Sequence, residues 1–148
     1  TPLMLNNYIA TIANGGVRYK LRIVNNMIDA TGESKNINPP NILNKVPLDQ
    51  KYMERIRLGF HNVVLRGTAS GYFSDGILGS GKTGTSETYY NRVKTTTRSF
   101  VGYFPYDKPE YAITIISPNI SYENSVNNYN YPINSRLSRQ IAKILFEK

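Results

Sequence analysis

The chain of 148 residues has 40% hydrophobic residues, a formal net charge of +8 and no cysteine. The length suits one domain with a hydrophobic core of its own, and the absence of cysteine excludes disulfides, thiolate chemistry and cysteine-based zinc sites. Lysine and arginine form no long run of like charges, so a nucleic-acid-binding tail is not expected. No apolar run is long enough to cross a bilayer. The sequence begins without methionine, and we expect any targeting segment to lie upstream of Thr1.

The N-terminal part predicts a helix and a small hairpin. Thr1 and Pro2 favour a helix start, because Thr caps a helix and Pro is accepted at its first position, and "NGG" at 14–16 predicts the helix end. Alternating apolar residues then predict one strand over 17–28. The turn-forming sequence "DATGE" at 29–33 predicts a return into a second short strand.

A surface connection and a long helix are expected next. Residues 34–48 are rich in Asn and Pro, which predicts irregular chain at the surface. Asp49 is a favoured helix-capping residue, and the apolar spacing after it predicts a helix to about residue 65. Residues 67–76 are rich in Gly, Ser and Asp, and they predict a loop.

The second half of the chain predicts three strands and a last helix. The strands are expected at about 77–86, 97–104 and 110–117, followed by a loop over 118–131 and a helix at about 132–147. The turn sequence "YDKPE" predicts that the last two strands form a hairpin. An apolar stripe on the final helix is expected to pack against the sheet; it comprises Ile133, Leu137, Ile141, Ile144 and Leu145. This order of elements predicts an α+β fold, with an antiparallel sheet flanked by helices.

The stretch "GILGSGKTGT" at 76–85 fits two functional motifs. Residues 76–83 match the phosphate-binding pattern G-x-x-x-x-G-K-[ST], and Lys82–Thr85 match the Lys-hydroxyl-Gly motif of penicillin-recognising enzymes. A phosphate loop needs a buried strand before it and a helix after it. Gly84 and the residues that follow it are unfavourable for a helix, so a strand is favoured and nucleotide binding is the weaker alternative.

As a strand, this motif carries groups that suit an anionic ligand. Lys82 supplies a positive charge for a carboxylate, and the hydroxyls of Thr83 and Thr85 supply hydrogen-bond donors. Gly84 allows another backbone to approach closely, and the N–H after it could face an oxyanion if a second donor were present. On these residues alone, an ordinary edge strand with a solvated lysine is the favoured interpretation.

Four segments together resemble the transpeptidase domain of penicillin-binding proteins, in that family's order along the chain. They are "TPLMLNNYIATIANGG" (1–16), "VVLRGTA" (63–69), "SGKTGTSE" (80–87) and "RSFVGYFPYDKPEYAITII" (98–116). In turn they resemble a helix and turn, a helix end and loop, the family's third motif, and the hairpin that follows this motif. Because the sequence ends one helix after the hairpin, residues 1–148 are identified as a C-terminal portion of this domain, most similar to class B, monofunctional proteins. The Asn-rich loop over 118–131 has no counterpart that we recognise.

The resemblance implies an activity, a location and partners. Members of the family are serine acyltransferases, D,D-transpeptidases that cross-link the D-Ala-D-Ala stem peptides of peptidoglycan outside the bacterial cytoplasmic membrane. The implied partners are the peptidoglycan stem peptide, β-lactam antibiotics and other cell-wall synthesis proteins, with no nucleic acid, no cofactor and no metal. Membrane attachment would come only from an N-terminal anchor outside this sequence.

By motif, the resemblance assigns substrate binding to four residues of this chain. Lys82 would bind or steer the substrate carboxylate, and Thr83 and Thr85 would donate hydrogen bonds to it. The Thr85 N–H would be one oxyanion donor, and Gly84 would leave room for the substrate backbone. No S-x-x-K sequence occurs here, so we expect no catalytic residue in this chain, the nucleophilic Ser upstream of Thr1, and an inactive isolated chain. The alternative is a sensor or a catalytically silent relative that binds penicillin without turnover.

For the other polar and aromatic residues, a structural role is supported as well as a functional role, or better. His61 is expected to be a surface or hydrogen-bonded helix residue rather than a catalytic one. Arg98 could face Lys82 across the sheet, or lie at the solvated rim. Tyr89 and Tyr90 are expected in the loop after the motif, where they could line a cleft.

Overall fold

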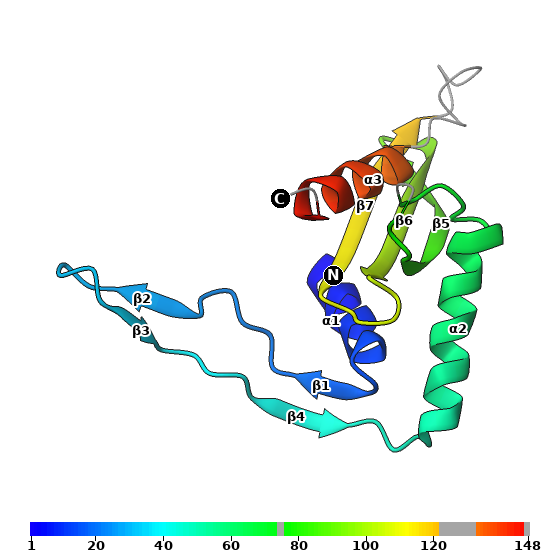
Figure 1. Cartoon of the computed structure of the whole chain (residues 1–148). Coiled ribbons are helices and arrows are strands. Elements are labelled where there is room, and N and C mark those ends of the chain that lie inside the picture. Colours follow the sequence, from blue (N-terminus) through cyan, green and yellow to red (C-terminus); the bar gives the residue numbers. More distant parts are fainter. Residues whose placement is uncertain (74–75, 122–132, 147–148) are drawn as a thin grey trace.

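The computed structural model describes residues 1–73, 76–121 and 133–146, and these residues contain three helices and seven strands (Figure 1). The helices are α1 (Pro2–Ala13), α2 (Gln50–Arg66) and α3 (Ile133–Phe146). Four short strands follow α1, namely β1 (Val17–Tyr19), β2 (Asn26–Ile28), β3 (Ser34–Asn36) and β4 (Ile42–Lys45). Three long strands follow α2, namely β5 (Ser80–Tyr90), β6 (Val93–Phe104) and β7 (Tyr111–Ser121).

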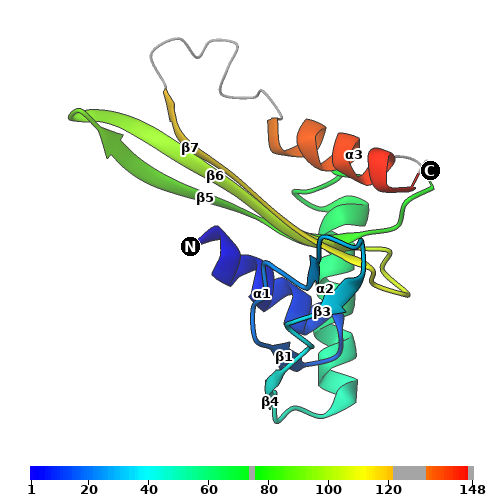
Figure 2. The ribbon, with the colours of Figure 1, turned by 90° about the vertical axis from the view of Figure 1, so that its left-hand side faces the viewer.

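The three long strands form one antiparallel sheet in the order β5-β6-β7. Helix α3 covers one face of this sheet and α1 the other (Figure 2), while α2 runs beside the start of β5 (Figure 1). The expected α+β fold, the three strands and the hairpin between the last two are therefore confirmed. The expected loop over 118–131 is shorter at its start, because β7 continues to Ser121, and its remainder lies outside the described residues.

Strand β6 connects two hydrophobic cores, one on each face of the sheet. Its side chains alternate between the faces, so Phe100 and Phe104 enter the core beneath α3. Val101 and Tyr103 enter the core beneath α1. Phe100, Tyr103 and Phe104 have no exposed surface. Because β6 is buried on both faces, it holds its neighbour β5 in a fixed position.

Helix α1 begins and ends where the sequence predicts. Thr1 caps it, since the Thr1 hydroxyl oxygen accepts a hydrogen bond from the Met4 N–H at 3.3 Å. The helix stops before Gly15 and Gly16, which have φ values of 79° and 99°. These positive angles suit glycine and end the helix. The buried side of α1 then packs on the sheet.

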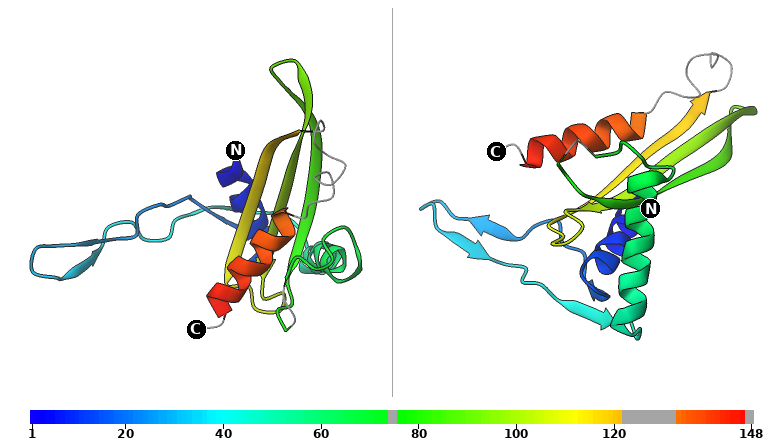
Figure 3. Two further views of the ribbon diagram at one scale, coloured as in Figure 1. Left: turned by 90° about the horizontal axis from the view of Figure 1, so that it is seen from above. Right: turned by 45° about the vertical axis from the view of Figure 1, so that its right-hand side comes forward.

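Residues 17–45, here called the arm, form a long two-stranded extension that leaves the sheet (Figures 1 and 3). β1 pairs with β4 near its base, and β2 pairs with β3 near its tip. The expected turn at 29–33 is confirmed. The single strand expected over 17–28 is wrong, because its middle has no continuous partner. The returning chain there contains Pro39 and Pro40, whose nitrogens cannot donate ladder hydrogen bonds.

Individual hydrogen bonds hold the arm together between its two paired ends. The Lys20 N–H donates to the Asn41 carbonyl at 2.8 Å, and the Arg22 guanidinium donates to the Asn38 carbonyl at 2.6 Å. The irregular surface connection expected over 34–48 is thus only partly correct. These residues do lie at the surface, but they contain β3 and β4.

Strand β5 is longer than the sequence pattern indicates. It continues through Tyr89 and Tyr90 and reverses into β6 at Asn91 and Arg92, which have φ values of 49° and 65°. Two consecutive positive φ angles are typical of a two-residue hairpin turn that matches the twist of the strands. The two tyrosines therefore belong to the strand, and the expectation of a loop at this position is wrong.

Helix α3 packs on the sheet through small and polar residues rather than through its apolar stripe. Its buried residues are Asn134, Ser138 and Ala142. Of the expected stripe, Leu145 packs against the core, while Ile133, Leu137, Ile141 and Ile144 are 37–71% exposed. The Ser117 hydroxyl donates to the Asn134 side-chain oxygen at 2.7 Å and fixes this face on β7. The expectation is correct for Leu145 and wrong for the other four residues, because periodicity identifies residues that share a helix face, not the face that meets the sheet.

Candidate functional site

The motif Lys82–Thr85 lies on β5, an edge strand of the sheet. β6 pairs with one edge of β5, and within the described parts of the chain no other strand pairs with its outer edge. Exposure rises along the strand, since Ser80 and Gly81 are buried whereas Lys82 and Thr85 are exposed. The motif therefore begins where β5 leaves the core. An unpaired strand edge at this point can accept another extended chain.

Helix α2 fixes the start of β5 through His61. Nδ1 of this buried histidine lies 2.7 Å from the Gly79 carbonyl oxygen, and the ring stacks on Tyr106 with centroids 4.0 Å apart. A carbonyl oxygen can only accept, so Nδ1 carries the proton in this hydrogen bond. Arg57, on the same helix, donates to the Tyr106 carbonyl at 2.7 Å. His61 is thus a hydrogen-bonded structural residue, as expected.

The geometry of β5 excludes the phosphate-loop interpretation. Such a loop needs backbone N–H groups around the anion and a helix directly after its Lys and Thr. Here Lys82 and Thr83 pair with Val101 and Phe100 of β6, and the chain continues as a strand to Tyr90. No helix begins at this position, so the nucleotide-binding alternative is wrong.

Lys82 and the two threonines of the motif project from opposite faces of the sheet, because successive strand side chains alternate. Lys82 lies opposite Val101 on the face covered by α1, and Thr83 lies opposite Phe100 on the face covered by α3. The Lys82 ammonium donates to the Thr83 carbonyl oxygen at 2.8 Å. The motif therefore offers a charge close to the strand backbone on one face and the hydroxyls of Thr83 and Thr85 on the other.

Thr83 contacts Thr68, a residue to which the sequence assigns no role. Their Oγ1 atoms lie 2.7 Å apart, across a separation of 15 residues along the chain. Thr68 lies two residues after the end of α2, in the "RGTA" part of a segment that resembles the family. No motif marks its side chain as a ligand group. Only the fold, which brings the end of α2 against β5, could reveal this pair.

Gly84 lies against the neighbouring strand. A Cβ at this position would lie 2.5 Å from Oγ of Ser99, its cross-strand partner on β6. This distance is shorter than real Cβ contacts allow, so any larger residue would force Ser99 to move. Glycine therefore leaves room for the Ser99 hydroxyl here, besides leaving the strand open to a ligand backbone.

Arg98 lies opposite Thr85 on β6 and not opposite Lys82. The suggestion that Arg98 faces Lys82 is therefore wrong, because Lys82 and Thr85 lie on different faces. Burial raises the pKa of the Tyr72 hydroxyl, and the positive charge of Arg98 offsets part of this rise. Tyr72 also packs on the Phe100 ring, with centroids 4.4 Å apart. On the face covered by α3, the hydroxyls of Thr83 and Thr85 thus lie near the positive charge of Arg98.

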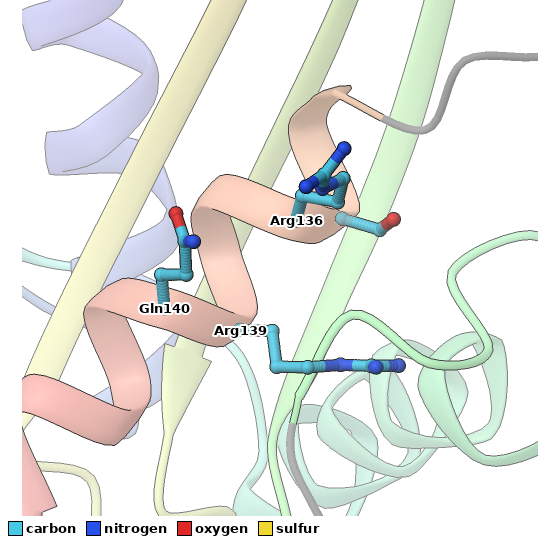
Figure 4. Close-up of a pocket in the computed structure, with 4 residues that line it drawn as sticks. Arg136, Arg139 and Gln140 are labelled. Atoms are coloured by element: carbon cyan, nitrogen blue, oxygen red, sulfur yellow. The ribbon is translucent and has the colours of Figure 1, made fainter.

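The described cavities lie away from the motif, and two of them involve Arg139. One, of about 270 Å³, is lined by Ser135, Arg136, Arg139 and Gln140 of α3 (Figure 4). Another, of about 380 Å³, lies between the end of α2 and the chain before β5, with Arg139 in its lining. Arg139 donates to the Gly71 carbonyl at 2.7 Å and so joins α3 to this segment. Neither cavity is lined by Lys82–Thr85, so the candidate site is a strand edge rather than either cavity.

The described residues form neither a metal-binding cluster nor a membrane-spanning helix. Within this part of the chain, no group of three or more His, Cys, Asp and Glu side chains is placed to hold a metal ion. No helix within residues 1–73, 76–121 and 133–146 combines the length and the apolar character that a bilayer crossing requires.

Comparison with known proteins identifies relatives of this fold. Residues 1–143 match the family model of the penicillin binding protein transpeptidase domain. The chain is 35% identical to penicillin-binding protein 2A of Bacillus subtilis over 99% of this chain and 22% of that protein. The solved structure of penicillin-binding protein 2B from Streptococcus pneumoniae strain R6 has a TM-score of 0.81 and 30% identity, over 99% of this chain and 25% of that one. The D,D-transpeptidase domain of a peptidoglycan glycosyltransferase from Eggerthella lenta has a TM-score of 0.68 and 28% identity, over 80% of this chain and 27% of that one.

These matches include the motif strand and all four segments that suggested the resemblance. The chain spans only about a quarter of the length of these relatives. The resemblance inferred from the sequence is confirmed. The chain belongs to the family of penicillin-binding protein transpeptidase domains.

Proposed function

We propose that residues 1–148 are the C-terminal portion of the transpeptidase domain of a class B penicillin-binding protein. The parent protein is then a serine-type D,D-transpeptidase that cross-links peptidoglycan stem peptides ending in D-Ala-D-Ala and is acylated by β-lactams. The observation that carries this proposal is the motif Lys82–Thr85 on an exposed edge strand, with its outer edge free of other described strands. Membership of the family supports it.

An edge strand suits an extended peptide, because main-chain groups of the peptide can pair with it as an added strand. Gly84 carries no side chain that would hold the peptide away, and it leaves room for the Ser99 hydroxyl on the neighbouring strand. The backbone N–H of Thr85 follows this glycine and serves as one oxyanion donor. The substrate backbone therefore lies along the outer edge of β5.

The side chains of the motif divide the recognition of the terminal carboxylate. Thr83 and Thr85 share one face of β5 and donate hydrogen bonds to the carboxylate, which strengthen because the acceptor is charged. The Lys82 ammonium lies against the Thr83 carbonyl and attracts the carboxylate as a nearby positive charge. The two threonine hydroxyls thus bind the carboxylate, while the charge of Lys82 steers it toward them.

Acyl transfer also needs a nucleophilic Ser and a base, which we place in another part of the parent protein. The Ser oxygen attacks the carbonyl carbon of the D-Ala-D-Ala peptide bond, the terminal D-Ala leaves, and an ester to the enzyme remains. Residues 1–148 contain no S-x-x-K sequence, so the isolated chain is inactive. The parent acts at the outer face of the cytoplasmic membrane, attached by an N-terminal anchor and together with other cell-wall synthesis proteins.

Intact-mass analysis of the longer parent polypeptide after incubation with benzylpenicillin tests this proposal. We expect one covalent adduct, and peptide mapping should place it on a Ser outside residues 1–148. A folded parent that forms no adduct would instead support a catalytically silent relative. An adduct inside residues 1–148 would contradict the assignment of the nucleophile.

A further inference from the structure

Thr68 is held rigidly at the point where α2 ends beside β5. The Gly67 N–H and the Ala69 N–H both donate to the Val63 carbonyl at 3.1 Å, so the backbone on either side of Thr68 is fixed. Ala69 has no exposed surface. The Thr68 side chain itself is exposed, and its Oγ1 lies 2.7 Å from Oγ1 of Thr83. A rigid backbone thus presents one hydroxyl to the motif.

The Thr68–Thr83 contact has two possible proton arrangements with different consequences. Each hydroxyl has one proton to donate and lone pairs that accept. If Thr83 donates to Thr68, its oxygen lone pairs face an incoming carboxylate and repel it. If Thr68 donates to Thr83, the Thr83 proton is free for the carboxylate. A chain of hydrogen bonds in this second arrangement also polarises, so that each bond strengthens the next.

We propose that Thr68 is a positioning residue of the carboxylate subsite. Its hydroxyl donates to Thr83 and thereby directs the Thr83 proton to the substrate carboxylate. This inference rests on the proposed function of the motif, since it concerns the same subsite. Thr68 acts through Thr83 and not through the reacting atoms.

The test uses the full parent protein with Thr68→Val, which keeps the shape of the side chain and removes its hydroxyl. The probes are benzylpenicillin and its methyl ester, which lacks the negative charge, and the measurement is the second-order rate constant of acylation. We expect Thr68→Val to lower the rate with benzylpenicillin by about fivefold to tenfold, the size of one net hydrogen bond between neutral groups such as the two hydroxyls. The rate with the ester should change less than twofold.

Three further variants separate positioning from a merely structural effect. Thr68→Ser keeps the hydroxyl and should retain the wild-type rate. Thr114→Val removes a hydroxyl that has no hydrogen-bond partner among the described residues, and it should leave the rate unchanged. In a Thr83→Val background, Thr68→Val should add no further loss, because contacting residues in one network are not additive.

The outcomes distinguish this inference from the proposed function. If wild-type parent is acylated and Thr68→Val keeps the rate, or loses it equally with penicillin and ester, the positioning role is wrong while the motif assignment stands. An additive loss in the Thr83→Val background would overturn it as well. If wild-type parent takes up neither probe, the proposed function fails and the inference fails with it.

Discussion

The sheet and the arm are both built from antiparallel strands, but only the sheet has a core. Strands β5, β6 and β7 are 11 or 12 residues long, and β6 is buried on both faces at its end. The arm strands are three or four residues long, and nearly all of their side chains are exposed. Figure 3 shows the arm leaving the body in both views. Antiparallel pairing alone therefore does not create a rigid support for a site.

The difference explains where the candidate site lies. β5 is fixed by β6 on one edge. His61 of α2 bonds to Gly79 directly before β5, and Thr68, just after α2, contacts Thr83. The motif on β5 can then be exposed without losing its geometry, since rigid neighbours hold it. The arm has an apolar content comparable to that of the sheet, but its apolar side chains, such as Ile23 and Ile28, are exposed to solvent.

The largest expected difference between the two regions is in stability. Phe100→Ala should lower the free energy of unfolding of the parent by about 3–5 kcal/mol, because it removes a fully buried aromatic ring from the core beneath α3. Ile28→Ala in the arm should change it by less than about 0.5 kcal/mol, since this side chain is 69% exposed. Urea unfolding of both variants makes the comparison. Equal losses would contradict the view that only the sheet has a core.

A smaller effect is expected at the motif itself. Gly84→Ala should cost about 0.5–1.5 kcal/mol, because its new Cβ meets the Ser99 hydroxyl, which must turn away from its present rotamer. Adding Ser99→Ala removes that oxygen and should restore most of the lost melting temperature. Calorimetry of the two single variants and the double variant gives the coupling between them. Additive losses would show that Ser99 is not the reason for glycine at this position.

The smallest effect is expected at the tip of the arm. Hydrogen bonds from the Thr31 hydroxyl and N–H, and from the Glu33 N–H, hold the pKa of the Asp29 carboxyl below its ordinary value of 3.8. Because the folded value is the lower one, this turn is stabilised above the unfolded pKa and loses that support as the pH falls through the folded pKa. Asp29→Asn should remove this dependence of the stability of the turn on pH.

Amide hydrogen exchange measures this local effect. The Thr31 and Glu33 amides should exchange faster in Asp29→Asn, relative to the intrinsic rate, than in wild type at neutral pH. The amides of β6 should not change. A change in β6 would show that the arm and the sheet unfold as one unit.

Much of the sheet could be predicted because its signals are local. Thr1 and the glycines after Ala13 delimit α1, and alternation with the "YDKPE" turn delimits the β6–β7 hairpin. The break in the arm is caused by two prolines on the returning segment, opposite the middle of the expected strand. The prolines are visible in the sequence, but the strand pattern of residues 17–28 does not show that they lie opposite it.

The remaining features depend on contacts between distant segments. The buried face of α3 was not predictable, because Asn134 is buried through its bond to Ser117 on β7 rather than through its own hydropathy. The four motif residues could be named from sequence. Their division between two faces, and the contact of Thr83 with Thr68, required the register of β5 and the end of α2.

The central claim is that β5 receives the ligand while the arm does not. Hydrogen–deuterium exchange of the full parent, with and without benzylpenicillin, tests this claim most directly. We predict slower exchange of amides within residues 80–90 on acylation, and no change within residues 17–45. Protection in the arm with unchanged exchange in β5 would contradict the account.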